Sequence, residues 1–434
     1  MKDKVLVVGA GIAGLGAATW ARDAGFDVTV IEATDRVGGR AVTATRPGSE
    51  DRIDVGTQYF HSNYRLAKQL LRSAGLAASI RPVRGRTRFF DRRAPGGSFT
   101  AGHRLPIIRA GGMTDNLRLL ASGAWRILRD PVSPFRLRDH VRLDTQTAGT
   151  RITDPFEWDF TARCLVLAGC LVEPGPADIS YLHMVRLMRI VLTTDYLALD
   201  GGIATLHERL AAGLDVRLST PATQLVWDGR VRGVTLADGT TVEATHTVLA
   251  TPPGAASVLM PSDWHEERAF LQATRHPPAL IVTFFLDGPL EDGVWSYILP
   301  SDPTRLVGFC VDAAQKNPAN IPSGKAALQA WICHPASTSA AALDNEALST
   351  RVLTELAPFF PGIDARVEHV QVQRHAAAVP QFPPGRNQAA LAFLARIDER
   401  PGLEVCGDYL TGGYMECALW SAERAVRRLR RLTM

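Results

Sequence analysis

The stretch Val8-Gly-Ala-Gly-Ile-Ala-Gly14 (VGAGIAG) comes almost at the start of the chain. The apolar residues before it, from 4 to 8, predict a buried strand, and the residues after it predict a helix. A second predicted strand, over residues 26–32, ends in Glu32 about 20 residues after the last of the three glycines. Strand, glycine-rich turn, helix, strand and terminal acid, in this order, predict a dinucleotide-binding α/β fold of the Rossmann type.

Each glycine of this turn has its own physical role. Gly9 permits the tight turn, Gly11 lets the backbone approach a pyrophosphate, and Gly14 lets the helix pack on the sheet. The start of the helix offers free N–H groups and a partial positive charge to the phosphates. Glu32 is expected to accept hydrogen bonds from ribose hydroxyls, and an ordinary glycine-rich turn is the alternative. The nucleotide-binding residues predicted here are Gly9, Gly11, Ala13, Gly14, Glu32 and Ala33.

Length and composition describe a globular protein with a large core. The chain has 434 residues, 46% of them hydrophobic, which is enough for two domains. A net charge of +4 argues against disorder and against a dedicated nucleic-acid-binding protein. Six scattered cysteines without a CxxC pair predict no metal site and no disulfide framework, so a reducing cytoplasm is the expected location. No segment approaches the ~20 apolar residues of a membrane-spanning helix.

The residues that follow the second strand carry a resemblance to a known family. Glu32-Ala-Thr-Asp-Arg-Val-Gly-Gly-Arg40 resembles the E-x-x-D-R-x-G-G-R signature of the flavoprotein amine oxidase superfamily, which includes monoamine oxidases, protoporphyrinogen oxidases and carotenoid desaturases. The resemblance implies that the dinucleotide is FAD. Gly38 and Gly39 would let the loop pass close to the pyrophosphate, while Arg36 and Arg40 would supply charge-assisted donors.

A second motif of that family lies about twenty residues further on. Asp54-Val-Gly-Thr-Gln-Tyr-Phe-His61 resembles the segment that runs beside the isoalloxazine ring in relatives. The resemblance implies that Gly56 contacts the ring because only a bare backbone fits there. The contacts expected from this motif are Gly56, Thr57 and Gln58 with the cofactor, and Tyr59 and His61 with the substrate.

Later segments resemble the family in the same order. The backbone of Ala222 and Thr223 matches the position that meets the adenine, and residues 405–418 resemble the C-terminal G-[DE]…G-x-x-E-G-A motif. In that motif Gly407 and Asp408 would contact ribitol or pyrophosphate. The helix that begins near Met415 would direct its positive end at flavin N1 and O2, which stabilises the anionic reduced flavin.

These segments predict an α/β fold with a discontinuous Rossmann-like FAD-binding domain, over residues 1–75, 195–260 and 390–434. An α+β substrate-binding domain would be built from the insertions, residues 76–194 and 261–389. Helical spacing of apolar residues predicts helices within 110–195. A mixed sheet is predicted from strands at 279–285, 294–299, 305–311 and 326–331.

The substrate-binding half departs from each branch of the family. Tyr414 resembles one wall of the aromatic amine cage of monoamine oxidases, where it would act on an amine through its ring. Ala378 stands where the second cage tyrosine is expected, and Ala377 stands at the position of the flavin-linking cysteine. The resemblance therefore implies noncovalent FAD and an incomplete cage. The lysine that amine oxidases hold near flavin N5 is absent from residues 277–286.

Residues 374–381 and 174–180 are instead similar to the porphyrinogen oxidase and desaturase branch. We therefore predict a biosynthetic FAD enzyme that removes hydride from a C–H bond of an apolar or cyclic small molecule, with O2 or another acceptor reoxidising the flavin. Amine oxidation, a redox-neutral isomerase or cyclase, and a flavin-binding electron carrier stay open. The candidate catalytic residues are Tyr414, His375, Tyr59 and His61.

The predicted helical region contains an arginine-rich stretch over residues 104–142. It predicts either a solvated helix face, because aspartates are interspersed, or peripheral contact with an anionic membrane or an acidic substrate. We favour the solvated face and predict no nucleic-acid partner; the sequence does not indicate an oligomeric state. The arginines are Arg104, Arg109, Arg118, Arg126, Arg129, Arg136, Arg138 and Arg142.

Overall fold

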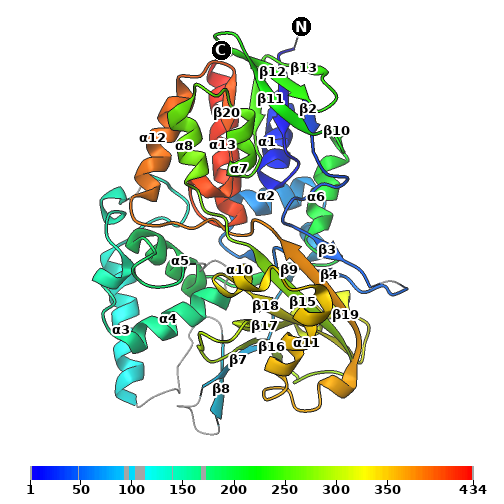
Figure 1. The fold of residues 1–434 in the computed structure, drawn as a ribbon, viewed down its shortest axis with the longest axis vertical. Coiled ribbons are helices and arrows are strands. Elements are labelled where there is room, and N and C mark those ends of the chain that lie inside the picture. The colour runs from blue at the N-terminus through cyan, green and yellow to red at the C-terminus, as the bar shows by residue number, and fades with distance from the viewer. Residues whose placement is uncertain are drawn as a thin grey trace.

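The computed structural model describes residues 2–46, 48–91, 97–102, 113–138, 140–167 and 173–432. Two bodies are visible in Figure 1. One holds a small parallel sheet with helices on both of its faces, and the other holds a larger sheet with helices α3, α4 and α5 beside it. The chain passes between these bodies several times, so both are built from segments that lie far apart in the sequence.

The first body is a five-stranded sheet in the order β10-β2-β1-β14-β20, and every neighbouring pair is parallel. Val5, Leu6 and Val7 are buried because helices cover both faces of the sheet. Helices α1 and α13 lie side by side on one face, and a Cβ on Gly16 would lie 2.6 Å from Leu419. The bounds are β1 Lys4–Val8, β2 Asp27–Ile31, β10 Asp215–Arg217, β14 His246–Leu249, β20 Leu403–Val405, α1 Ile12–Asp23 and α13 Met415–Leu432.

The other elements of this body complete the two helical layers and a small antiparallel sheet, β11-β12-β13. Helix α8 contacts α7 and α12, and these three helices pack on the face of the sheet opposite to α1 and α13, while Figure 1 shows α2 and α6 below α1. Their bounds are α2 Arg65–Ser73, α6 Ala204–Ala211, α7 Pro253–Leu259, α8 His265–Gln272, α12 Arg386–Asp398, β11 Ala222–Trp227, β12 Val231–Leu236 and β13 Thr241–Glu243. The predicted α/β fold class is confirmed by this architecture.

The second body is built on a seven-stranded sheet in the order β19-β15-β18-β17-β16-β7-β8. Only the β16–β7 pair is parallel, so the sheet is mixed, as the sequence predicts. Strands β7, β8 and β19 are absent from the sequence analysis, because their alternation is short or interrupted. The bounds are β7 Arg86–Phe90, β8 Ser98–Ala101, β15 Ala279–Asp287, β16 Val294–Ile298, β17 Phe309–Asp312, β18 Lys325–Ile332 and β19 Val367–His375.

Short elements connect the two bodies. β3 pairs with β4, and β9 lies between β5 and β6. Their bounds are β3 Thr43–Ala44, β4 Ile53–Asp54, β5 Phe60–His61, β6 Ile80–Pro82 and β9 Tyr196–Leu199. The helices of the second body are α3 Met113–Arg129, α4 Pro155–Leu167, α5 Tyr181–Thr193, α9 Ala313–Lys316, α10 Ala336–Ala340 and α11 Asn345–Leu356.

The arginine-rich stretch is not a uniform solvated face. Arg126 is buried and donates to Glu157, whereas Arg129 is exposed and lies over the ring of Trp125. Leu117 and Leu128 of α3 are 61% and 79% exposed, so this helix also presents large apolar side chains at the surface. Arg104 and Arg109 lie outside the described residues, and membrane contact stays a prediction. In the described part of the chain, no helix is long and apolar enough to cross a membrane.

Glu416 joins the first turn of α13 to the start of α2. Its carboxylate accepts hydrogen bonds from the backbone N–H groups of Arg65 and Leu66, both at 2.8 Å, and of Ala67 at 3.0 Å. These N–H groups have no partner within their own helix, since they lie in its first turn. Glu416 is fully buried, so the glutamate of the C-terminal motif anchors a helix.

We expect Glu416→Ala to lower the free energy of unfolding by about 3 kcal/mol, because it leaves three N–H groups of the first turn of α2, two of them buried, without an acceptor. Thermal unfolding of the purified protein would measure the change. Glu423→Ala is the control, since Glu423 lies on the same helix and forms exposed pairs with Arg65 and Arg427. Equal unfolding temperatures for both variants would contradict this role of Glu416.

Candidate functional site

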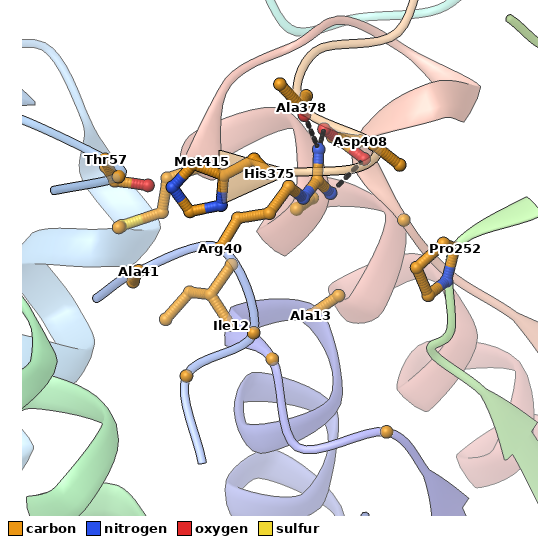
Figure 2. Close-up of a pocket in the computed structure, with 18 of the residues that line it drawn as sticks. Ile12, Ala13, Arg40, Ala41, Thr57, Pro252, His375, Ala378, Asp408 and Met415 are labelled. Carbon is orange, nitrogen blue, oxygen red and sulfur yellow. Dashed lines mark hydrogen bonds and ion pairs between the residues drawn. The ribbon is translucent and has the colours of Figure 1, made fainter. Parts of the chain in front are cut away.

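A cavity of about 710 Å³ lies between the two bodies. Its wall includes the glycine-rich turn after β1, the loop after β2, the Gly56–Tyr59 loop and the first turn of α13. Figure 2 shows Arg40, His375 and Met415 among the side chains that line this space. Segments from the start, middle and end of the chain therefore meet at one site.

The three glycines of the turn differ in what surrounds them. Gly9 has φ +107°, and a Cβ there would lie 2.8 Å from the carbonyl oxygen of Ala250. A Cβ on Gly14 would lie 1.9 Å from the carbonyl oxygen of Gly9. A Cβ on Gly11 would meet nothing within 4 Å, and Gly11 lines the cavity. The fold itself requires Gly9 and Gly14, while Gly11 leaves room in the cavity for a ligand.

Glu32 lines the cavity and also organises the turn. Its carboxylate accepts hydrogen bonds from the backbone N–H of Ala10 at 2.8 Å and of Thr34 at 2.9 Å. It therefore holds the loops that follow β1 and β2 in fixed positions. The predicted contact of Glu32 with ribose stays a prediction.

Arg40 and Asp408 form a bidentate ion pair at 2.7 and 2.8 Å (Figure 2). Arg40 also donates to the carbonyl oxygen of Ala378 at 2.5 Å. Burial alone would raise the pKa of Asp408, but the adjacent Arg40 guanidinium outweighs it and lowers the pKa below its usual value. The sequence predicts separate cofactor contacts for the two residues, and their pairing is visible only in the structure.

The Gly56–Tyr59 loop forms part of the cavity wall. A Cβ on Gly56 would lie 2.0 Å from the carbonyl oxygen of Arg40, so contact with the chain itself already requires glycine there. The side-chain amide of Gln58 donates to the carbonyl oxygen of Asp54 and accepts from the Lys316 ammonium at 2.9 Å. Its polar atoms are therefore engaged within the protein.

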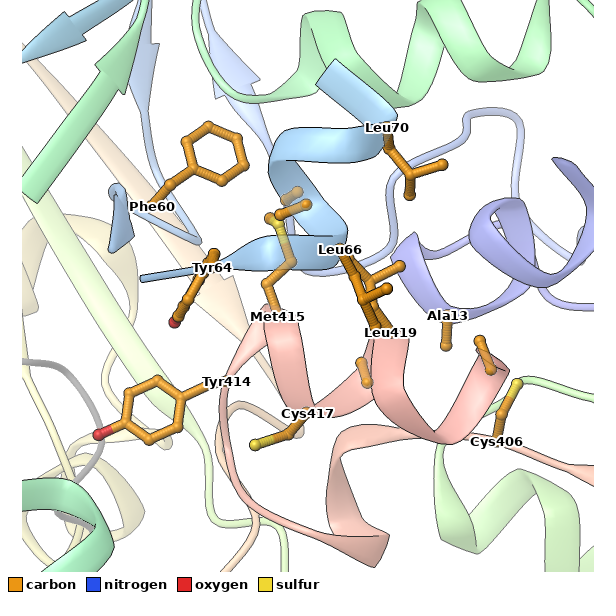
Figure 3. Close-up of a cluster of buried hydrophobic side chains, with 14 of the residues drawn as sticks. Ala13, Phe60, Tyr64, Leu66, Leu70, Cys406, Tyr414, Met415, Cys417 and Leu419 are labelled. Carbon is orange, nitrogen blue, oxygen red and sulfur yellow. The ribbon is translucent and has the colours of Figure 1, made fainter. Parts of the chain in front are cut away.

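Three of the four candidate catalytic residues lie together. The ring of His61 is 5.6 Å from that of Tyr59 and 5.8 Å from that of Tyr414, in edge-to-face arrangements. His61 Nδ1 hydrogen-bonds Thr194 Oγ1 at 2.8 Å. Tyr414 and Met415 lie beside Tyr64 at the start of α13 (Figure 3). All three candidates line the cavity.

His375, the fourth candidate, also lines the cavity, but its Nε2 lies 2.6 Å from the carbonyl oxygen of Val55. A carbonyl oxygen only accepts, so Nε2 carries the proton and Nδ1 is left as an acceptor. Burial lowers the pKa of His375, which keeps the ring neutral near pH 7. His375 is therefore bonded to the backbone through Nε2. Its predicted role at the flavin stays a prediction.

Most predicted cofactor-binding residues line the cavity, with two exceptions. Gly14 packs inside α1, and the hydroxyl of Thr223 donates to the carbonyl oxygen of Thr235 on β12. One part of the cavity wall, from β17, β18 and the loop after β18, is not predicted from the sequence. Buried strand residues have the same apolar pattern whether they pack in a core or line a cavity. The members of this part of the wall are Phe309, Trp331, Cys333 and His334.

A family model described as flavin containing amine oxidoreductase matches residues 12–430. The chain belongs to this family. This membership agrees with the flavin-dependent oxidoreductase that the sequence motifs predict. Among curated proteins, the L-amino-acid oxidase of Mus musculus is 42% identical over 74 residues, which are 17% of this chain and 12% of that protein. The lysine-specific histone demethylase 1B of Mus musculus is 28% identical over 265 residues, 57% of this chain and 30% of that protein.

The matched stretches thus span less than a third of the length of either relative. Solved structures match over the whole chain. A redesigned putrescine oxidase has a TM-score of 0.78 at 20% identity and covers 99% of both chains. Cyclohexylamine oxidase from Brevibacterium oxydans IH-35A has a TM-score of 0.76 at 23% identity and covers 100% of both. At these identities the similarity shows the shared fold.

The cavity wall fits FAD. Gly11 leaves open space at the start of α1, whose first N–H groups suit a pyrophosphate. The wall includes Glu32, Ala33 and Ala222 from the predicted nucleotide segments and Met415 at the start of α13. The segments that resemble the family's FAD motifs therefore all contribute to one cavity.

The glycines yield a matched pair of predictions. Gly11→Ala is expected to fold normally and to bind FAD roughly tenfold or more weakly, a loss of about 1.4 kcal/mol, because its methyl group would occupy ligand space. Gly14→Ala is expected to lower the unfolding temperature of the apoprotein as well, since its methyl group would overlap a carbonyl oxygen. Apoprotein unfolding and FAD titration would separate the two effects. Identical behaviour of both variants would contradict the assignment.

Asp408→Asn should make stability less dependent on acid. The lowered pKa of Asp408 means that its pairing with Arg40 contributes fully above the unfolded-state pKa of about 4 and is lost as pH falls through the folded-state pKa. We expect the apoprotein variant to be less stable by about 2 kcal/mol at pH 7, and the difference to vanish in stronger acid. Unfolding temperatures from pH 7 downward would test this, with the exposed Asp23→Asn as control.

Proposed function

We propose that this flavoenzyme removes hydride from a C–H bond of a neutral, apolar, ring-containing small molecule. The supporting observation is the aromatic part of the cavity wall, formed by Tyr59, Tyr414, Phe309 and Trp331. The rings of Phe309 and Trp331 stack at 5.4 Å with an interplanar angle of 13°, and both residues line the cavity, so this part of the wall is an aromatic surface. Such a surface favours a flat or cyclic ligand through burial and ring contacts.

The placement of charge supports a neutral substrate. In the described part of the chain, the carboxylates and guanidinium groups of the cavity wall are Glu32, Arg36, Arg40 and Asp408. All of them belong to the nucleotide motifs, and the described wall residues from β17 and β18 carry no charge. The carboxylate of an amino acid, or the second ammonium of a diamine, would be buried there without a partner of opposite charge, which is unfavourable.

The chain would then contribute orientation, exclusion of water and electrostatic support. FAD supplies the hydride acceptor when it is bound. The N–H groups at the start of α13 provide a positive helix end at the wall, where Met415 lies. The aromatic wall would position the reacting carbon and keep water away from it. Tyr59, His61 and Tyr414 are the proposed substrate contacts.

Oxidation of an apolar monoamine in its neutral form is the second candidate. Tyr414 supports it, because its buried ring faces the cavity at the position that resembles an amine-oxidase cage wall. The second wall of that cage is absent, since Ala378 has no ring and its carbonyl oxygen binds Arg40. An amine substrate would therefore depend on the other rings of the wall.

Anaerobic reduction of the bound flavin would test the proposal. The holoenzyme would be mixed with hydroaromatic ring compounds, cyclic monoamines, aliphatic diamines and L-amino acids, and the loss of flavin absorbance would be followed. We expect ring compounds without a permanent charge to reduce the flavin at least tenfold faster than diamines or amino acids, a difference of about 1.4 kcal/mol in activation free energy. Faster reduction by diamines or amino acids would overturn the substrate class. Conversion of ring compounds to isomers without bleaching would favour redox-neutral chemistry.

A further inference from the structure

Lys316, at the end of α9, is a buried cation of the second body that contacts the Gly56–Tyr59 loop (the cofactor loop). It is 3% exposed, and its ammonium lies 3.1 Å from Asp54 Oδ2, 3.1 Å from the carbonyl oxygen of Gln58 and 2.9 Å from Gln58 Oε1. An ammonium has three donors, and these three acceptors match that number. Lys316 lies outside residues 277–286, where the family resemblance places a lysine near flavin N5.

The partners of Lys316 organise the loop beside the cavity. Asp54 also accepts hydrogen bonds from Thr43 Oγ1 and from the backbone N–H of Ile203, both at 2.8 Å. Gln329 on β18 donates to the carbonyl oxygen of Asp54 at 2.9 Å. The loop is therefore held from the second body at two points, one on α9 and one on β18.

The carbonyl contact reaches the cavity through one peptide plane. The Gln58 carbonyl belongs to the planar peptide that leads into Tyr59, so its bond to Lys316 fixes the orientation of that plane. Tyr59 lines the cavity and belongs to the same hydrophobic cluster as Phe309 and Trp331. The strands that carry Phe309 and Trp331 are β17, directly before α9, and β18, which follows it. One ammonium thus connects the aromatic wall to the cofactor loop.

We propose that Lys316 is a positioning residue that sets the placement of the Gly56–Tyr59 loop, and of Tyr59, relative to the flavin and the aromatic wall. The expected effect on the rate of flavin reduction rests on the proposed function of this cavity. The expected effect on the flavin spectrum does not depend on which substrate the enzyme uses. A neutral side chain at position 316 would leave the buried Asp54 carboxylate without its cation.

Three variants test the proposal. Asp54→Asn/Lys316→Met removes both charges, so no buried ion is left unpaired. Lys316→Arg keeps the charge, but its planar fork cannot meet the three acceptors in the same arrangement. Lys325→Met is the control. Lys325, the first residue of β18, is more exposed than Lys316 and pairs with Asp287 on β15 and Glu368 on β19. For each holoenzyme, the unfolding temperature, the FAD affinity, the visible flavin spectrum and the rate of anaerobic flavin reduction would be measured.

We expect both position-316 variants to change the visible flavin spectrum and to reduce the flavin at least tenfold more slowly than the wild type. Lys325→Met should match the wild type in every measurement. A wild-type spectrum and reduction rate in Lys316→Arg would overturn the proposal, even if the double variant did not fold. If no ring compound reduces the wild-type flavin, the proposed function fails, while the spectra and FAD affinities still decide the role of Lys316.

Discussion

The ion pair between Arg40 and Asp408 is the contact on which the site depends. Arg40 follows the paired glycines of the first motif, and Asp408 comes from the last segment of the chain. A third contact, from Arg40 to the Ala378 carbonyl oxygen, adds a segment of the second body. A buried carboxylate is costly without a cation, so the closed arrangement of these three segments is favoured over any in which they separate. The cavity that they enclose is consequently formed by the polypeptide itself.

Several residues of the family motifs are likewise needed for packing of the chain itself, whether or not a cofactor is bound. A side chain at Gly56 would overlap the carbonyl oxygen of Arg40. Glu32 accepts hydrogen bonds from two backbone N–H groups, and Glu416 anchors the start of α2. Each serves the packing of the chain near the cavity. The residues that face open space are fewer, and Gly11 is the clearest of them. Motif residues in this family fold therefore divide into those that build the site and those that leave room in it.

The cavity wall from the second body differs in chemistry from the wall formed by the predicted nucleotide motifs. The nucleotide half holds the charged side chains, whereas the described wall from the second body offers rings. Tyr59 and Tyr414 come from the cofactor loop and the C-terminal motif, so the aromatic surface extends over both bodies. Lys316 and Gln329 of the second body bond the cofactor loop. The geometry of the site therefore depends on how the two bodies pack against each other.

The sequence by itself determined the fold class, the family and most of the predicted nucleotide-binding residues that line the cavity, because these rest on short segments whose glycines, strand pattern and acid lie close together in the chain. The tertiary structure alone decided the pairing of Arg40 with Asp408, 368 residues apart, and the bond between Lys316 and the cofactor loop. It also decided that Phe309 and Trp331 face a cavity, since buried strand residues have the same pattern whether they meet a core or a ligand. Contacts across long sequence separations leave no local signal, and here they join the two bodies around the cavity.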